Sequence, residues 1–298
     1  MRARWLLLLL LAAGACASQE ERASSAHDLA VRDLERGDLH AAEQIARQYD
    51  ARWRNQPRSP WHWRFLLLSA EVLIAQGKAA EALALVHAPV VSDAEAEPLE
   101  ARRLKVRAHA ALNLGRYEEA TRLLEEASRQ ATAAALPRLA LEIHVLRGLL
   151  LIRTNHEAAG EAVTRVAYSR AVAQHDPYWQ AAAANNLGLE RMRAYRYDEA
   201  IPLLEQALKA AKSIEAQRFA AASLANLGTC YYRIGDSDKA LAFLQQAAEI
   251  QERIGATVGL QSSLGDIGNV HVMQGHADRA VPFYQRALAM ARASAPWD

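Results

Sequence analysis

A repeat of forty residues is the feature that most constrains how this chain can fold. Glycine returns at Gly188, Gly228 and Gly268, each forty positions after the last. Two further positions keep the same period with alanine, and they are occupied by Ala200, Ala240, Ala280, Ala207, Ala247 and Ala287. Self-similarity at a fixed period of roughly 20–50 residues is typical of solenoid proteins. We therefore expect stacked copies of one supersecondary unit.

Each unit is predicted to consist of two helices joined by a tight turn. In the unit that begins near Leu224, apolar residues are spaced three or four apart, as on one face of a helix. Gly235 ends this helix, because glycine adopts the left-handed conformation without steric cost. Asp236 or Ser237 can cap the second helix. The apolar stripe of that helix comprises Ala240, Leu241, Leu244, Ala247 and Ile250.

This unit resembles the tetratricopeptide repeat (TPR) family. The residues that match the family pattern one by one are Leu224, Leu227, Gly228, Tyr231, Ala240, Leu244 and Ala247. The small residues allow two helices to cross closely, and the large ones fill the space beside the crossing. The period of forty is similar to the longer-helix variety of the family in kinesin light chains and many bacterial TPR proteins.

The same register extends toward the N-terminus and predicts seven repeats. The turn positions are Gly37, Gly77, Gly115, Asn155, Tyr195, Gly235 and Gly275. Asn tolerates the left-handed region, whereas Tyr195 departs from the pattern. The resemblance implies an all-α fold, a right-handed superhelical solenoid of about seven helix-turn-helix repeats over residues 23–293. We place the repeats near residues 23–54, 61–91, 98–135, 138–175, 177–215, 217–255 and 257–293.

Residues 1–15 have the pattern of a signal peptide. Arg2 and Arg4 precede an apolar run over residues 5–13, which is far shorter than the ~20 residues needed to span a bilayer. Residues 13–16 resemble a bacterial lipobox in which Cys16 is lipidated, although Ala13 replaces the usual Leu. The alternative is cleavage after an Ala-x-Ala sequence, which leaves a soluble periplasmic protein. We expect an outer-membrane lipoprotein that faces the periplasm, with residues 16–22 as a tether.

Half of the six tryptophans lie in one proline-containing segment between the first two repeats. Trp53, Trp61 and Trp63 alternate there with arginines. One interpretation is an exposed aromatic and basic patch for a partner or for lipid headgroups. The other, which we favour, is that the rings pack between adjacent repeats.

Charge and motifs exclude several classes of function. The formal charge is +1, and removal of residues 1–15 takes away two arginines and no acid, which leaves −1. A near-neutral chain with interspersed charges is not typical of nucleic-acid binding. The sequence contains no phosphate-binding glycine loop, nucleophile elbow or zinc-protease motif. We therefore predict a non-enzymatic protein without a cofactor or metal, whose membrane contact is limited to the lipid anchor.

The resemblance implies that the first helix of each repeat lines a concave, partner-binding face. Asn offers both a donor and an acceptor to a peptide backbone, and Arg or Lys pairs with a carboxylate. On the alternative interpretation, Asn186 and Asn226 hydrogen-bond within the array and bind nothing. The candidate residues are Arg102, Lys105, His109, Asn113, Asn185, Asn186, Leu189, Arg193, Asn226, Thr229, Arg233, Asp266 and Asn269.

The C-terminal end is expected to leave an apolar face open. Val281, Tyr284 and Leu288 lie on the last predicted helix, and the tail that follows, residues 294–298, is short. Trp297 could fold back as a small cap; otherwise the face is available for self-association or a partner. We expect an interaction scaffold of the bacterial cell envelope that binds a protein or peptide. The alternatives are a peptide-sensing module and an accessory subunit that docks an enzyme through this end.

Overall fold

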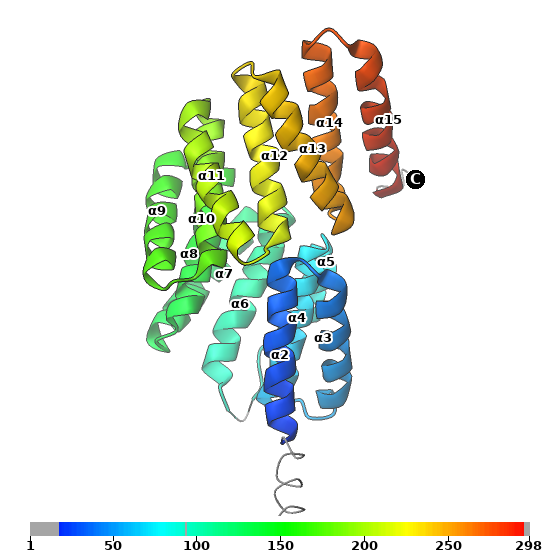
Figure 1. The fold of residues 1–298 in the computed structure, drawn as a ribbon. Coiled ribbons are helices and arrows are strands. Elements are labelled where there is room, and N and C mark those ends of the chain that lie inside the picture. Colours follow the sequence, from blue (N-terminus) through cyan, green and yellow to red (C-terminus); the bar gives the residue numbers. More distant parts are fainter. Residues whose placement is uncertain (1–17, 93, 295–298) are drawn as a thin grey trace, which may run out of the picture.

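The computed structural model describes residues 18–92 and 94–294, which form fourteen helices and no strand. The helices pair in chain order into seven hairpins stacked in series (Figure 1). This confirms the predicted all-α solenoid of helix-turn-helix repeats. The pairs are α2 (Gln19–Arg36) with α3 (Leu39–Trp53), α4 (Pro60–Ala75) with α5 (Ala79–Leu85), α6 (Ala96–Asn113) with α7 (Tyr117–Ala133), α8 (Pro137–Arg153) with α9 (Glu157–Ala173), α10 (Pro177–Arg193) with α11 (Tyr197–Ser213), α12 (Gln217–Arg233) with α13 (Ser237–Arg253), and α14 (Thr257–Met273) with α15 (Ala277–Ser294).

The repeating glycines lie where the two helices of a hairpin cross. A Cβ atom at Gly228 of α12 would lie 2.6 Å from Cγ of Leu244 in α13. A Cβ at Gly188 of α10 would lie equally close to Leu204 of α11. No side chain fits at such a distance, so glycine permits the close approach and the leucine fills the space that it leaves.

The turns within the hairpins take the same left-handed conformation whether or not the residue is glycine. Gly235 has φ of 88°, while Asn155 and Tyr195 have φ of 60° and 59°. At Tyr195 the backbone N–H donates to the Met192 carbonyl at 3.0 Å, and the next N–H donates to the Arg191 carbonyl at 2.9 Å. These bonds close the end of α10, and the side chain of Tyr195 is 80 % exposed. The hairpin geometry therefore imposes the conformation on a residue that does not favour it.

Helix α2 begins at Gln19, inside the predicted tether of residues 16–22, and Ser18 and Glu21 form a capping box at its start. The Ser18 hydroxyl accepts from the Glu21 N–H at 3.1 Å, and the Glu21 carboxylate accepts from the Ser18 N–H at 2.6 Å. The second helix of repeat two, α5, has only seven residues. The signal segment, Cys16 and Trp297 lie outside the described residues.

The three tryptophans at the end of α3 and the start of α4 pack inside the solenoid. Trp53 and Trp63 are 5 % and 6 % exposed. Trp53 and Trp61 pack with Phe65 in a cluster between α2, α3 and α4. Trp63 packs toward α6 and donates its indole N–H to the carbonyl of Val91 at 2.9 Å. Packing between repeats is therefore confirmed for these rings.

The curvature of the solenoid brings the first repeat back against later ones. Figure 1 shows α2 beside the lower end of α12. Arg138 of α8 donates to Glu35 of α2 at 2.8 Å, and Nε of Arg36 lies 3.6 Å from Glu215 in the loop before α12. We call this boundary between α2 and helices α8 to α12 the seam. The seam closes one side of the concave surface.

Candidate functional site

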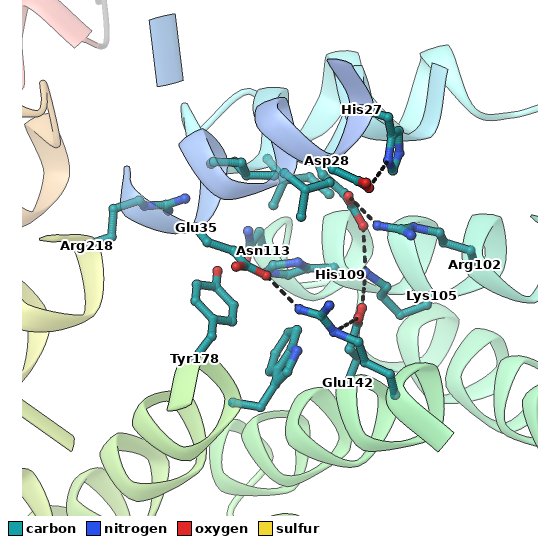
Figure 2. Close-up of a pocket in the computed structure, with 17 residues that line it drawn as sticks. His27, Asp28, Glu35, Arg102, Lys105, His109, Asn113, Glu142, Tyr178 and Arg218 are labelled. Atoms are coloured by element: carbon teal, nitrogen blue, oxygen red, sulfur yellow. Dashed lines mark hydrogen bonds and ion pairs between the residues drawn. The ribbon is translucent and has the colours of Figure 1, made fainter. Parts of the chain in front are cut away.

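A cavity of about 300 Å³ lies on the concave side, and every helix that lines it is the first helix of its repeat. The lining comes from α2, α4, α6, α8, α10 and α12, so each of the first six repeats contributes (Figure 2). A second cavity, of about 350 Å³, adjoins it and shares His27, Arg102, Arg138 and Glu142. Its wall adds the apolar residues Leu99, Leu136 and Leu139. The first helices therefore line the concave face, as the resemblance implied.

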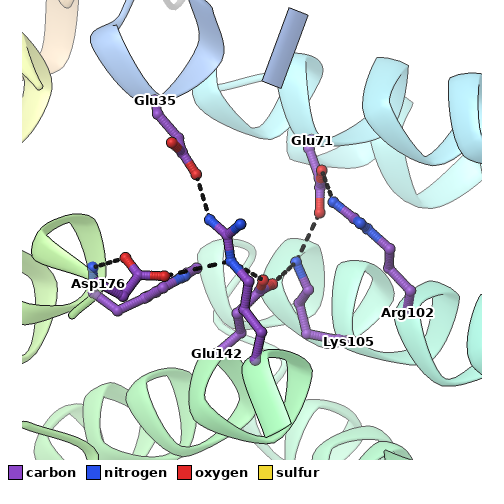
Figure 3. A network of polar contacts seen from close by, with 8 residues as sticks. Glu35, Glu71, Arg102, Lys105, Glu142 and Asp176 are labelled. Atoms are coloured by element: carbon purple, nitrogen blue, oxygen red, sulfur yellow. Dashed lines mark hydrogen bonds and ion pairs between the residues drawn. The ribbon is translucent and has the colours of Figure 1, made fainter. Parts of the chain in front are cut away.

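One side of the cavity is occupied by a network of ion pairs (Figure 3). Lys105 lies 2.7 Å from Glu71 and 2.7 Å from Glu142, and Arg102 lies 3.2 Å from Glu71. Lys105 is only 5 % exposed, and a charge buried to this extent needs partners. Burial alone would raise the pKa of Glu71, but Arg102 and Lys105 outweigh it and hold that pKa well below its usual range.

Arg138 extends the network toward the seam. Its guanidinium donates to Glu35 at 2.8 Å and lies 3.4 Å from Asp176. Burial raises the pKa of Glu35, and Arg138 opposes that shift. The cations of this side are therefore fully engaged by carboxylates from α2, α4, α8 and the start of α10.

Two histidines in the cavity are neutral. Burial and the charge of Arg102 lower the pKa of His27 to about 4. Burial and the charge of Lys105 lower the pKa of His109 to about 3. A neutral imidazole presents one donor and one acceptor, so each can hydrogen-bond to a polar ligand without adding charge.

The opposite side of the cavity carries polar groups without partners. Arg218 of α12 makes no hydrogen bond or ion pair with any described residue, and burial lowers its pKa. The hydroxyl of Tyr178 and the amide of Asn113 also have no partner among residues 18–92 and 94–294. Figure 2 shows Arg218 and Tyr178 on one side and Arg102, Lys105 and Glu142 on the other. This side is where a ligand would find unpaired donors.

The predicted residues of repeat three converge on the cavity. Arg102, Lys105, His109 and Asn113 of α6 all line it. For Arg102 and Lys105, however, the carboxylates they hold are internal ones. Arg102 is paired with Glu71, and Lys105 with both Glu71 and Glu142, so a partner carboxylate would have to compete with these ion pairs. The binding of a partner by Arg102 and Lys105 stays a prediction.

The predicted residues of repeats five to seven do not line the cavity. Instead, most of them hydrogen-bond to other residues of the array. Asn226 donates to Asn185 at 3.1 Å, and Asn186, 7 % exposed, donates to the Val145 carbonyl at 3.4 Å. This is the alternative that the sequence left open. Their binding of a partner stays a prediction, and the same holds for Leu189 and the other members of the set. Those others make the following contacts: Arg193 is bonded to Asn155, Thr229 to Asp266 and Asn269 to the Tyr284 hydroxyl, and Arg233 lies over the Tyr232 ring.

Sequence reasoning missed Arg218, Tyr178 and Arg138. The three lie forty residues apart, at the same position near the start of consecutive first helices. That position is one helical turn before the register of Arg102, which is the first candidate in its own helix. The period itself was therefore the signal that could have found them.

The described part of the chain offers no group of three or more His, Cys, Asp or Glu that could hold a metal ion. None of its helices is both long and apolar enough to cross a membrane.

The fold and the cavity define a helical repeat solenoid with a concave binding site. Residues 179–253 and residues 260–294 match two family models, each described as a tetratricopeptide repeat, and neither is a catalytic family. No curated protein sequence matches the chain. These matches support the resemblance noted from the last three repeats.

Several solved structures share the fold. The Rap protein complexed with Competence and Sporulation Factor has a TM-score of 0.70 at 15 % identity, over 91 % of this chain and 76 % of Rap. NprR in complex with its cognate peptide NprX has a TM-score of 0.61 at 13 % identity, over 90 % and 78 %. A chain of the APC/C hetero-tetramer Cut9-Hcn1 has a TM-score of 0.64 at 17 % identity, over 91 % and 46 %. At these identities the likeness is one of fold.

Proposed function

We propose that this protein is a non-enzymatic interaction scaffold that binds a peptide segment of its partner in the concave cavity. The observation that carries this proposal is the convergence of six first helices on one cavity with unpaired donors on one side. The similarity of fold to NprR, which was solved with a peptide, supports the same class of ligand.

The size and lining of the site suit a short extended segment. Ligand pockets are typically about 300–1,000 Å³, so this cavity admits a few residues and excludes a folded domain. Asn113, His109 and Tyr178 offer hydrogen-bonding groups to a peptide backbone. The adjoining cavity, walled by Leu99, Leu136 and Leu139, suits apolar side chains of the same segment.

The proposal is tested with a photo-crosslinking residue. Benzoylphenylalanine in place of Asn113 would sit in the cavity, whereas the same residue in place of Arg129 would sit on α7, away from it. We expect the Asn113 site to crosslink one short stretch of a partner, mapped by mass spectrometry, and the Arg129 site to crosslink none of it. Equal crosslinking from both sites would exclude the cavity as the binding site.

We propose in addition that the protein is exported and anchored in the outer membrane through lipidated Cys16, with a soluble periplasmic protein as the alternative. The support is the signal-like pattern of residues 1–15 and the lipobox-like residues 13–16. Metabolic labelling with a fatty-acid analogue is expected to label the wild type and not Cys16→Ser. An unlabelled wild type found in the soluble periplasmic fraction would favour the alternative.

A second candidate is docking, or self-association, through the last hairpin. Val281 and Leu288 of α15 are 48 % and 50 % exposed. Tyr284 is unsuitable for a test, because its ring fills the space over Gly268 and its hydroxyl donates to Asn269 at 2.8 Å. Leu288→Asp is the better variant. Loss of a partner or of a dimer with this variant, while crosslinking from Asn113 is absent, would favour docking through α15.

A further inference from the structure

We propose that two copies of this protein associate through the outer face of α15, with the two α15 helices antiparallel about a two-fold axis at Gln285. This interface rests on the second candidate function, docking through the last hairpin, and not on the cavity. It gives that face one partner, a second copy of the chain.

The outer face of α15 corresponds to a face that is covered in the preceding repeat. Leu241 and Ala248 of α13 pack against a cluster that includes Ile267 of α14. Forty residues later, Val281 and Leu288 stand at the same positions of α15. They are 48 % and 50 % exposed, since no described helix follows α15 (Figure 1). The face is therefore built like one that a helix covers.

An open groove of about 520 Å³ runs beside Leu288, between α14 and α15. Its lining includes Val258, which is 80 % exposed, and the small residues Gly265 and Ala287. A Cβ at Gly265 would meet nothing within 4 Å. The groove therefore has room for an apolar side chain from a helix that lies against α15.

The order of side chains along α15 is complementary to itself. Asp278, Val281, Gln285, Leu288 and Arg292 are spaced three and four apart, so they form one stripe along the helix. A valine and an aspartate precede Gln285, and a leucine and an arginine follow it at matching intervals. An antiparallel second copy centred on Gln285 would place each Val281 against a Leu288. A two-fold interface requires a patch of this kind, which fits a second copy of itself.

The two charged ends of the stripe favour the antiparallel direction. Asp278 and Arg292 are exposed, and neither side chain has an ion-pair partner among residues 18–92 and 94–294, whereas Arg286 is paired with Glu252 at 2.5 Å. In the antiparallel arrangement each Asp278 would meet an Arg292. In a parallel one, like charges would face each other at both ends, which is unfavourable.

Gln285 sets the register of the two helices. Its amide carries both a donor and an acceptor, so two copies can hydrogen-bond to each other at the axis. The side chain is exposed and hydrogen-bonds to no residue in the described part of the chain. A polar residue within an apolar helix contact fixes its register, at a cost in stability. A shift by one turn would separate the two amides and both ion pairs.

The arrangement is tested first by crosslinking of the full-length chain with a short bismaleimide. With Gln285→Cys, the two thiols of a dimer lie beside the axis and should be joined. With Asp278→Cys they should not, because each lies beside Arg292 of the other copy, about 21 Å along the helix from its own counterpart. Cys230 is buried, and the wild type serves as the blank for the native cysteines.

The second measurement is the Kd of the dimer by sedimentation equilibrium. Leu288→Asp should raise the Kd about tenfold or more, because it places a charge in the apolar contact of both copies. Asp278→Arg and Arg292→Asp should each raise it severalfold, and the double variant should restore the wild-type value. Arg279→Asp makes the same charge change about 100° around the helix from Asp278 and is the control. Circular dichroism confirms that each variant keeps its helicity.

Four results would overturn the inference. A monomeric wild type would leave the face to another partner, and a dimer that is unaffected by Leu288→Asp would lie elsewhere on the surface. Equal crosslinking of Asp278→Cys and Gln285→Cys would exclude the antiparallel arrangement. A double charge variant that stays weak would exclude the register. Photo-crosslinking from Asn113 tests the cavity independently, so either proposal can fail without the other.

Discussion

Glu35 of the first repeat accepts a hydrogen bond from Arg138 of the fourth at 2.8 Å, across 103 residues of sequence. With Arg36 and Glu215, 3.6 Å apart, this pair joins the first repeat to later ones across the seam. These contacts are polar and partly exposed, so each is worth little by itself and is weakened by salt. The seam is therefore the part of the site that is easiest to open.

The first prediction concerns opening of the seam. Glu35→Ala is expected to loosen the first repeat, because Arg138 retains Asp176 and Glu142 as partners while α2 loses its bond to α8. Hydrogen exchange in α2 should become faster, and high salt should have the same effect on the wild type. Glu126→Ala, which breaks an exposed pair within α7, is the control. Unchanged exchange in α2 would show that the seam does not depend on this pair.

The second prediction concerns the buried lysine. Lys105→Met leaves Glu71 and Glu142 facing each other without their shared cation. Breaking a buried ion pair in this way costs about 3–5 kcal/mol, which urea unfolding can measure. A variant as stable as the wild type at neutral pH would mean that the network contributes no net stability.

The same site predicts a pH dependence. Because the folded-state pKa of Glu71 is depressed, its stabilising contribution is present above the ordinary value of 4.5 and is lost as the pH falls below it. Thermal unfolding of the wild type between pH 6 and 3 should show this loss. Lys105→Met should show a smaller loss over the same range, since its Glu71 has a less depressed pKa.

The third prediction compares two glycines in first helices. Gly228→Ala places a methyl group 2.6 Å from Leu244 and should destabilise the protein by about 1–3 kcal/mol. Gly265→Ala meets nothing within 4 Å and should stabilise it by up to about 1 kcal/mol, because alanine favours the helix. Chemical denaturation measures both. Equal effects would contradict the close crossing of α12 and α13.

The fourth prediction concerns Glu190 of α10, which is 3 % exposed and has a carboxylate oxygen without a hydrogen-bond partner. Burial and the nearby Glu161 raise the pKa of Glu190 from 4.5 to about 7. The folded state therefore binds an extra proton between these values, and stability falls as the pH rises through that window.

Glu190→Gln removes this cost. The variant should melt at a higher temperature than the wild type at pH 8, and the difference should shrink toward pH 5. Glu205→Gln, on the exposed face of α11, is the control and should show no such trend. A difference that does not vary with pH would mean that Glu190 does not titrate in this range.

The repeat architecture could be predicted from the sequence because its determinants are local. The spacing of Gly228, Tyr231, Ala240 and Leu244 specifies two helices, a turn and a close crossing within one unit of forty residues. The same register located the turn at Asn155 and also the turn at Tyr195, where the side chain alone would argue against a left-handed conformation. That first helices face inward was implied by the resemblance to the TPR family and not by the spacing itself.

Only the tertiary structure decided which inward residues meet. The contacts of Glu35 with Arg138 and of Gly37 with Arg218 depend on curvature that accumulates over several repeats, and no spacing within a repeat encodes it. For the same reason the sequence could not show that Lys105 is neutralised internally by Glu71 and Glu142, whereas Arg218 has no ionic partner among residues 18–92 and 94–294. The periodicity of a helix reveals which of its faces is buried. Which residue it meets across the cavity depends on how far each repeat is rotated relative to the one before, added up over several repeats.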